Sequence, residues 1–146
     1  MSMVASVVAL LLVAPAAQVG GPVPEPDPVA VVKAFYKRDS IRAYELYSAR
    51  LKDLFIKDES PGEVGNLDFA FHMNGQDVED GWEKTLTFDL IARGSDRAVV
   101  RVTFRNFQPQ DIHYTLVRER GRWLIDDARS VAAESWVLSE ILKGAR

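Results

Sequence analysis

The order of hydrophobic and polar residues changes twice along this chain of 146 residues. Residues 3–17 are almost entirely apolar, apolar residues recur at helical spacing over residues 28–57, and from Lys84 onward they alternate with polar residues. These three patterns are typical of a targeting segment, of amphipathic helices and of half-buried strands. We therefore expect a leader, then helices, then a sheet.

The apolar run at the N-terminus predicts a signal peptide. The first charged residue is Glu25, and the apolar run is too short to cross a hydrocarbon core of roughly 30 Å as a helix. Ala14 and Ala16 suit the small-residue positions of a cleavage site, so cleavage is expected after Ala16 or Ala17. Because no Lys or Arg precedes Lys33, a short uncleaved anchor is the alternative.

The sequence contains no cysteine, and this excludes several kinds of chemistry. A disulfide framework, a thiol nucleophile and a Cys-based zinc site cannot form. A bacterial lipoprotein also needs a cysteine to carry its lipid. We therefore expect a periplasmic or secreted protein with no stable membrane anchor after cleavage.

The same pattern divides the chain into a signal peptide (1–17), a Pro- and Gly-rich linker (18–27) and a single domain (28–146). The first helix of the domain is expected over Pro28–Arg38, because Asp27 can cap it and proline suits the first helical position. A second helix, capped by Asp39 or Ser40, is expected to carry the apolar stripe between residues 41 and 55.

The alternating part predicts a four-stranded antiparallel meander that starts near residue 84 and turns at Gly94-Ser95-Asp96 and at Gly121. Its inward face is expected to be formed by Leu86, Phe88, Leu90, Val100, Val102, Phe104, Ile112 and Leu116. A last helix is expected over Val131–Lys143. Helices followed by a curved antiparallel sheet define an α+β fold.

Charge and motif content argue against several classes of function. The net charge is -3 with acidic and basic residues interspersed, so we expect no nucleic-acid partner. No phosphate-binding Gly-rich loop or Gly-x-Ser-x-Gly motif occurs, and no cofactor is expected. Two histidines without cysteine give no transition-metal motif, and His113, out of phase with Tyr114, is expected on the outer face of the sheet.

Three short pieces carry a resemblance to a known family. They are the opening helix with Phe35-Tyr36, the Gln76-Asp77 dipeptide and the Gly-Arg-Trp-x-Ile-x-Asp ending at 121–127. With them the chain resembles the cone-shaped nuclear transport factor 2-like superfamily and, within it, the exported bacterial family called domain of unknown function 3828. The resemblance implies a pocket between helices and sheet and allows a homodimer through the open sheet face. It implies no catalytic residues.

The segment 58–81 is the expected place of a binding site, because it is longer than ordinary connections and such segments are often functional. It contains His72 and Asp77, which we expect to bind a ligand together with Tyr47 and Tyr114. Asp77 has a structural alternative, in which its carboxylate caps a helical turn or accepts backbone N–H groups. The acidic residues of the segment lack the spacing of a calcium loop, and no metal site is expected.

Three functions remain open. The leading one is an exported, non-enzymatic domain that binds a small ligand or an envelope protein. The first alternative is a small hydratase or isomerase with Asp77 or His72 as base and Tyr47 or Tyr114 as hydrogen-bond donor. The absence of titratable groups from the expected inward face argues against it. The second alternative is an envelope toxin-immunity or inhibitor protein.

Overall fold

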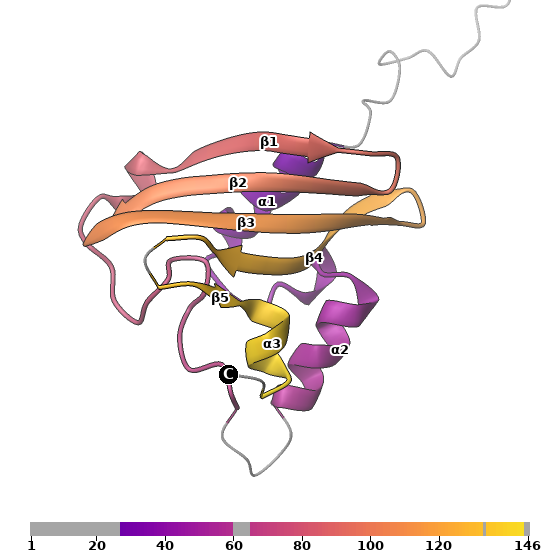
Figure 1. The fold of residues 1–146 in the computed structure, drawn as a ribbon, viewed down its shortest axis with the longest axis horizontal. Coiled ribbons are helices and arrows are strands. Elements are labelled where there is room, and N and C mark those ends of the chain that lie inside the picture. Colours follow the sequence, from indigo (N-terminus) through magenta and orange to yellow (C-terminus); the bar gives the residue numbers. More distant parts are fainter. Residues whose placement is uncertain (1–26, 60–64, 133, 145–146) are drawn as a thin grey trace, which may run out of the picture.

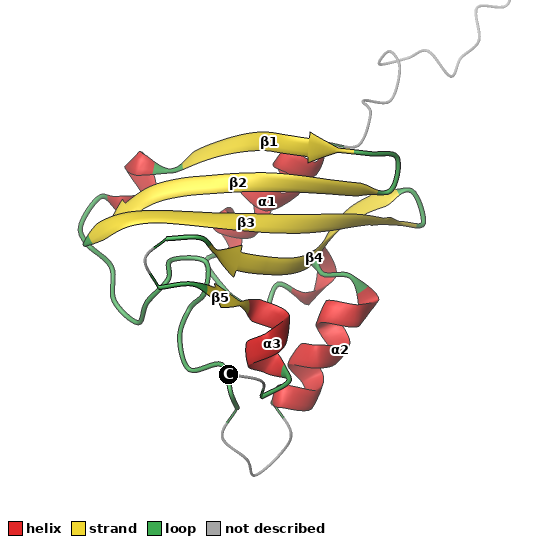
Figure 2. Cartoon of the chain, viewed as in Figure 1, coloured by secondary structure: helices red, strands yellow, loops and turns green. Residues whose placement is uncertain are grey.

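The computed structural model describes residues 27–59, 65–132 and 134–144, and the fold is α+β as expected (Figures 1 and 2). The predicted signal peptide and all but the last residue of the predicted linker lie outside the described residues. The strands form one antiparallel sheet in the order β1 (Thr87–Arg93), β2 (Arg97–Asn106), β3 (Gln108–Glu119), β4 (Arg122–Ser130) and β5 (Trp136–Val137). The prediction of four strands missed β5, which pairs with the end of β4.

Helix α1 (Pro28–Arg38) forms as predicted and covers one face of the sheet (Figure 1). The Asp27 side chain accepts a hydrogen bond from the Val29 backbone N–H at 2.9 Å, which satisfies one of the free donors of the first turn. Val32, Phe35 and Tyr36 form its buried face. The first helix could be predicted because its cap and its apolar stripe are local features.

The second helix starts later than predicted. A 3-10 turn, η2 (Tyr44–Leu46), precedes α2 (Ala49–Asp58), whose cap is Ser48 and not Asp39 or Ser40. The Ser48 backbone N–H donates to the Ile125 carbonyl oxygen at 2.8 Å, and Tyr47 bridges to Ile125 of β4. This pairing holds the chain extended at residues 47 and 48, so the helix can begin only afterwards.

The last helix is also shorter than predicted. Instead of a helix over 131–143, β5 comes first and α3 (Leu138–Leu142) follows, packed beside α2 (Figure 1). The Asp127 carboxylate accepts hydrogen bonds from the backbone N–H and hydroxyl of Ser139, at 3.0 and 2.6 Å. Trp136 is held extended by its pairing with Ser130.

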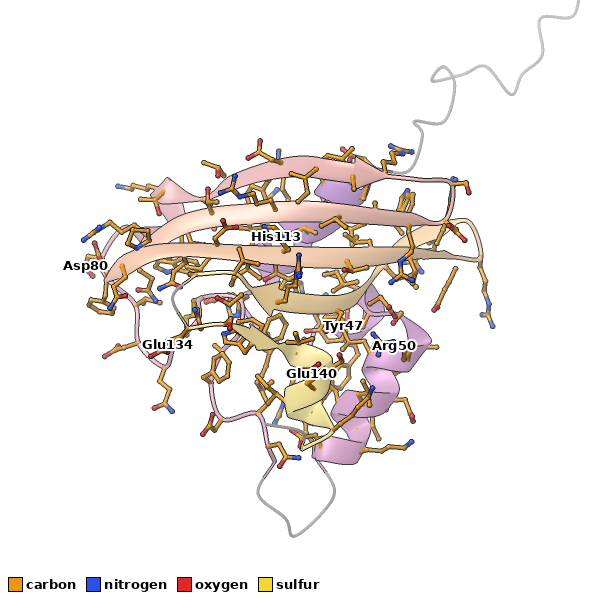
Figure 3. All side chains as sticks on the ribbon, viewed as in Figure 1. Tyr47, Arg50, Asp80, His113, Glu134 and Glu140 are labelled. Carbon is orange, nitrogen blue, oxygen red and sulfur yellow. The ribbon has the colours of Figure 1, made fainter. Side chains whose placement is uncertain are left out.

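Alternation decides which side chains of the sheet face α1. In β2 and β3 buried positions alternate with exposed or half-buried ones, and His113 lies on the open face as predicted (Figure 3). β1 departs from the prediction, because Leu90 is exposed and Phe88 is only half-buried. β1 is an edge strand with a bulge between Leu90 and Ala92, so only its first half contacts the core.

An aromatic cluster fills the space between α1, α2 and the sheet. The Phe35 ring lies 5.5 Å from Phe71 and 5.9 Å from Tyr114, measured between centroids, and all three side chains are fully buried. Trp82, on the short helix η3 (Trp82–Thr85), closes the cluster at 5.5 Å from Phe104. The interior of the domain is therefore closely packed.

Candidate functional site

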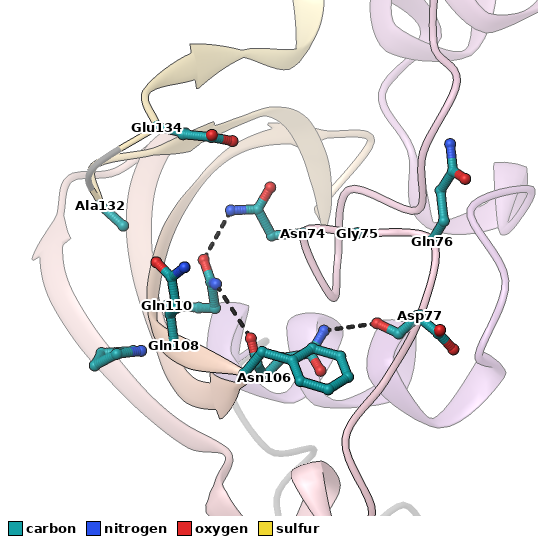
Figure 4. Close-up of a pocket in the computed structure, with 11 residues that line it drawn as sticks. Asn74, Gly75, Gln76, Asp77, Asn106, Gln108, Gln110, Ala132 and Glu134 are labelled. Carbon is teal, nitrogen blue, oxygen red and sulfur yellow. Dashed lines mark hydrogen bonds between the residues drawn. The ribbon is translucent and has the colours of Figure 1, made fainter.

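A cleft of about 300 Å³ lies between the 74–77 segment and the turn that joins β2 to β3 (Figure 4). We call it the amide cleft because amide side chains dominate its lining. These are Asn74, Gln76, Asn106, Gln108 and Gln110. Asp77 and Glu134 add carboxylates on either side of the Asn74–Gln110 pair (Figure 4).

Asn106, at the end of β2, holds the loop side of the cleft. Its amide nitrogen donates to the carbonyl oxygens of Met73 at 2.9 Å and Asp77 at 3.0 Å, and its side-chain oxygen accepts from the Glu79 N–H at 2.9 Å. The side chain is buried, and these bonds satisfy both its donors and its acceptor. A single side chain thus pins residues 73–79 to the sheet.

A second series of hydrogen bonds fixes the side chains at the floor of the amide cleft. The Trp136 ring N–H donates to the Asn74 side-chain oxygen at 2.9 Å, and the Asn74 amide donates to the Gln110 side-chain oxygen at 2.7 Å. Asn74 has a positive φ of 53°, a conformation that asparagine tolerates better than most residues. The amides of the floor are therefore oriented by β3, β5 and the loop together.

Phe107 forms the rim of the cleft in an unfavourable conformation. Asn106 pairs with Gln108, which leaves Phe107 alone in the turn with a φ of 62° and 58% of its surface exposed. The left-handed region costs a non-glycine residue about 1–2 kcal/mol. The Glu79 carboxylate accepts the Phe107 N–H at 2.6 Å and so stabilises this turn.

The structure separates Asp77 from the other three predicted site residues. Asp77 lines the amide cleft, and its exposed carboxylate makes no hydrogen bond to a described residue, so it does not cap a helical turn. His72, Tyr47 and Tyr114 surround Phe35, with ring centroids at 5.7, 5.9 and 5.9 Å. They are 3%, 3% and 0% exposed and do not line the cleft.

The buried tyrosine hydroxyls bond within the protein. Tyr36 donates to the His72 carbonyl oxygen at 2.7 Å, and its oxygen lies 2.9 Å from the Tyr114 hydroxyl. Tyr47 donates to the Ile41 carbonyl oxygen at 2.5 Å. Burial raises the pKa of Tyr36, Tyr47 and Tyr114, so the three hydroxyls stay protonated.

His72 is the buried imidazole of the interior. Its Nε2 lies 3.3 Å from the Asp39 carboxylate, and its Nδ1 has no hydrogen-bond partner within the described part of the chain. Burial lowers the pKa of His72, and Asp39 opposes that shift only in part. The side chain is therefore neutral near pH 7 and enclosed by rings.

Sequence reasoning did not find Asn106, Phe107, Gln110 or Glu134. The sequence held one sign of this site: a phenylalanine stands in the turn between two alternating strands, where glycine or asparagine is usual. Among residues 27–59, 65–132 and 134–144, no three His, Asp or Glu side chains gather as a metal site. None of the helices in these ranges has the length and apolar character needed to cross a membrane.

Comparison with known proteins gives a likeness of fold. No family model matches the sequence, and no curated protein matches it. Among solved structures, a chain of the type VI native effector-immunity complex Tae3–Tai3 from Ralstonia pickettii superposes with a TM-score of 0.53 at 19% sequence identity. The match covers 76% of this chain and 99% of that chain.

Proposed function

We propose that this chain is an exported, non-enzymatic binding protein of the immunity type, which neutralises a toxin in the bacterial envelope. The observation that carries the proposal is the likeness to a chain of an effector-immunity complex, which spans 99% of that chain. The apolar N-terminal run supports export to the compartment where such a toxin acts. The cone-shaped nuclear transport factor 2-like classification, with its exported bacterial family, remains our proposal for the wider relationship.

The packed interior supports binding at the surface. The hydroxyls of Tyr36 and Tyr114 lie 2.9 Å apart, and both side chains are within the ring cluster around Phe35. Rings that fill a core stabilise the fold and offer nothing to a substrate. The functional contacts of such a domain belong on its outside, where the amide cleft and Phe107 are.

The enzyme alternative finds no comparable support. It needs Asp77 or His72 as a base beside Tyr47 or Tyr114 in one pocket. Asp77 is exposed in a cleft that neither tyrosine lines, and His72 is 3% exposed. A small ligand, in contrast, has a candidate place in the groove of about 500 Å³ between α1 and β1, lined in part by Tyr36, Trp82 and Phe88.

A protection assay tests the proposal. Exported toxin-like proteins encoded beside this chain's gene are expressed in the periplasm of a host, each alone and each together with the full chain. We expect one of them to stop growth alone and to be tolerated when the chain is present. A variant without residues 3–17 should fail to protect, because it stays in the cytosol. Failure of the full chain to protect against every such protein would contradict the proposal.

A further inference from the structure

We infer that the amide cleft and Phe107 together form the docking surface for a loop of the partner protein, and that this loop places one Lys or Arg side chain in the cleft. The inference rests on the proposed function, because it assumes a protein partner. The inference adds the place where the partner binds and the basic side chain with which it binds.

The negative charge of the amide cleft favours a cationic ligand. None of its 11 lining residues is basic, while Asp77 and Glu134 bring carboxylates to its two sides (Figure 4). Both carboxylates are exposed, and neither forms an ion pair with a residue that the structure describes. The nearby Arg105 is paired with Glu79 at 3.5 Å. Two uncompensated negative charges at a concave surface attract a positive group.

The oxygens of the floor suit an ammonium or guanidinium group. The side-chain oxygens of Asn74 and Gln110 each accept one hydrogen bond, from Trp136 and Asn74, which leaves each a second lone pair. Lysine offers three N–H donors and arginine five. Because the floor amides are already held by their neighbours, a cation can bind them without a large cost of ordering.

The size of the cleft favours one side chain over a whole cofactor. Its volume of about 300 Å³ lies at the lower end of the range of small-molecule pockets, about 300–1,000 Å³. A long basic side chain enters such a space and leaves its backbone outside. The partner's loop must then pass over the rim, where Phe107 lies.

Phe107 supplies the apolar part of the contact. A bulky side chain in the left-handed region persists only where the surroundings hold it, and such strain clusters at functional positions. Here the Glu79 carboxylate holds the turn at 2.6 Å, and the ring is left 58% exposed. Exposed aromatic residues beside polar groups are typical anchors of protein interfaces. The exposed ring adds apolar surface that a protein loop can bury beside its cation.

A peptide titration tests the cleft directly. The probes are acetyl-Gly-Arg-Gly-amide and its citrulline counterpart, which has the same shape without the charge, followed by the side-chain amide signals of Asn74 and Gln110 in NMR spectra of the isotope-labelled chain. We expect the arginine peptide to shift these signals and to bind at least tenfold more tightly than the citrulline peptide. Equal binding of the two peptides, or shifts confined to other residues, would overturn the inference.

Variants locate the charge. Asp77→Asn with Glu134→Gln should weaken binding of the arginine peptide at least tenfold while the fold is retained, because both residues are exposed. Glu140→Gln removes one exposed carboxylate on α3 and is the matched control for the single variants Asp77→Asn and Glu134→Gln, each of which should bind more weakly than it does (Figure 3). An equal loss of peptide affinity in the control would show that the overall charge of the protein attracts the peptide, and it would contradict binding in the amide cleft.

The protection assay with the same variants separates this inference from the proposed function. If the unmodified chain protects and the double variant protects equally well, the toxin does not bind in the amide cleft, and the immunity function stands. If the arginine peptide binds in the cleft but the chain protects against no toxin, the immunity function is wrong and the cleft stands as a site for basic peptides. Loss of protection in the double variant and not in Glu140→Gln supports both.

Discussion

The hydroxyl groups of Tyr36 and Tyr114 meet at 2.9 Å inside the domain and join α1 to β3. Tyr36 also donates its only hydroxyl hydrogen to the His72 carbonyl oxygen at 2.7 Å. Tyr114 must therefore be the donor and Tyr36 the acceptor in the bond between them. This direction makes the two tyrosines unequal in their contribution to stability.

Removal of the Tyr36 hydroxyl should be the more costly change. Tyr36→Phe leaves the buried Tyr114 hydroxyl without its acceptor and the His72 carbonyl without its donor, so we expect a loss of about 2–4 kcal/mol in the free energy of unfolding. Tyr114→Phe removes one bond and leaves the Tyr36–His72 bond in place, and it should cost about 1 kcal/mol. Urea unfolding of both variants measures the difference. Equal losses would contradict the assigned direction.

Burial of His72 should make stability depend on pH. Its pKa is lowered in the folded state, whereas the unfolded chain has the usual value of 6.5. As the pH falls below about 6.5 the unfolded state therefore binds a proton that the folded state does not, and the free energy of unfolding decreases. The decrease continues until the pH reaches the pKa of His72 in the folded state.

The two histidines of the chain provide a variant and its control. In urea unfolding between pH 7.5 and 5, His72→Gln should reduce the fall in stability. His113→Gln, a half-buried residue on the open sheet face, should retain it. The same fall in His72→Gln as in the unmodified chain would show that another group is responsible.

Loss of the Asn106 side chain should loosen one wall of the cleft. Asn106→Ala removes three hydrogen bonds to residues 73, 77 and 79, and we expect a cost of about 1–3 kcal/mol. The Glu79 N–H loses its acceptor, so its hydrogen exchange should become faster. Gln108→Ala is the control, since this exposed amide makes no hydrogen bond within the described ranges, and stability should stay within about 0.5 kcal/mol. Unchanged exchange at Glu79 in Asn106→Ala would contradict this role.

Relief of the strained turn should not cost stability. Phe107→Gly removes the left-handed penalty of about 1–2 kcal/mol and adds about 0.5–1 kcal/mol of chain entropy to the unfolded state, so we expect a gain between zero and about 1.5 kcal/mol. Arg120→Gly, at a φ of 53° in the β3–β4 turn, should gain similarly. Thermal unfolding compares the two. A clear loss of stability in Phe107→Gly would mean that its ring serves the fold and not a partner.

What the sequence could predict depended on how local each feature is. Helix α1 was predicted with its start at Pro28 and its end near Arg38, because Asp27, Pro28 and the apolar stripe are adjacent in the chain. The starts of α2 and α3 were misplaced, because each is set by a distant strand residue, Ile125 and Asp127 respectively. Alternation predicts which face a strand side chain takes, but it does not say how far α1 reaches along the sheet, and so it did not predict that Leu90 is exposed.

The candidate site was beyond sequence reasoning for the same reason. Asn106, Asn74 and Glu134 come from three separated segments and meet only when the sheet brings them together. Asp77 lines the amide cleft, but the residues expected to bind a ligand with it, His72, Tyr47 and Tyr114, are core residues. Aromatic and histidine side chains look alike in sequence whether they line a pocket or fill a core.

The affinity between this chain and the toxin that it protects against tests the immunity function and the amide cleft together, and calorimetry with a catalytically inactive form of the toxin measures it. We predict a tight complex of one chain with one toxin, weakened at least tenfold by Phe107→Gly and by Asp77→Asn with Glu134→Gln, and unchanged by Arg120→Gly. A complex that forms with the same affinity in all of these variants would contradict binding through the amide cleft, and the absence of any complex would contradict the immunity function itself.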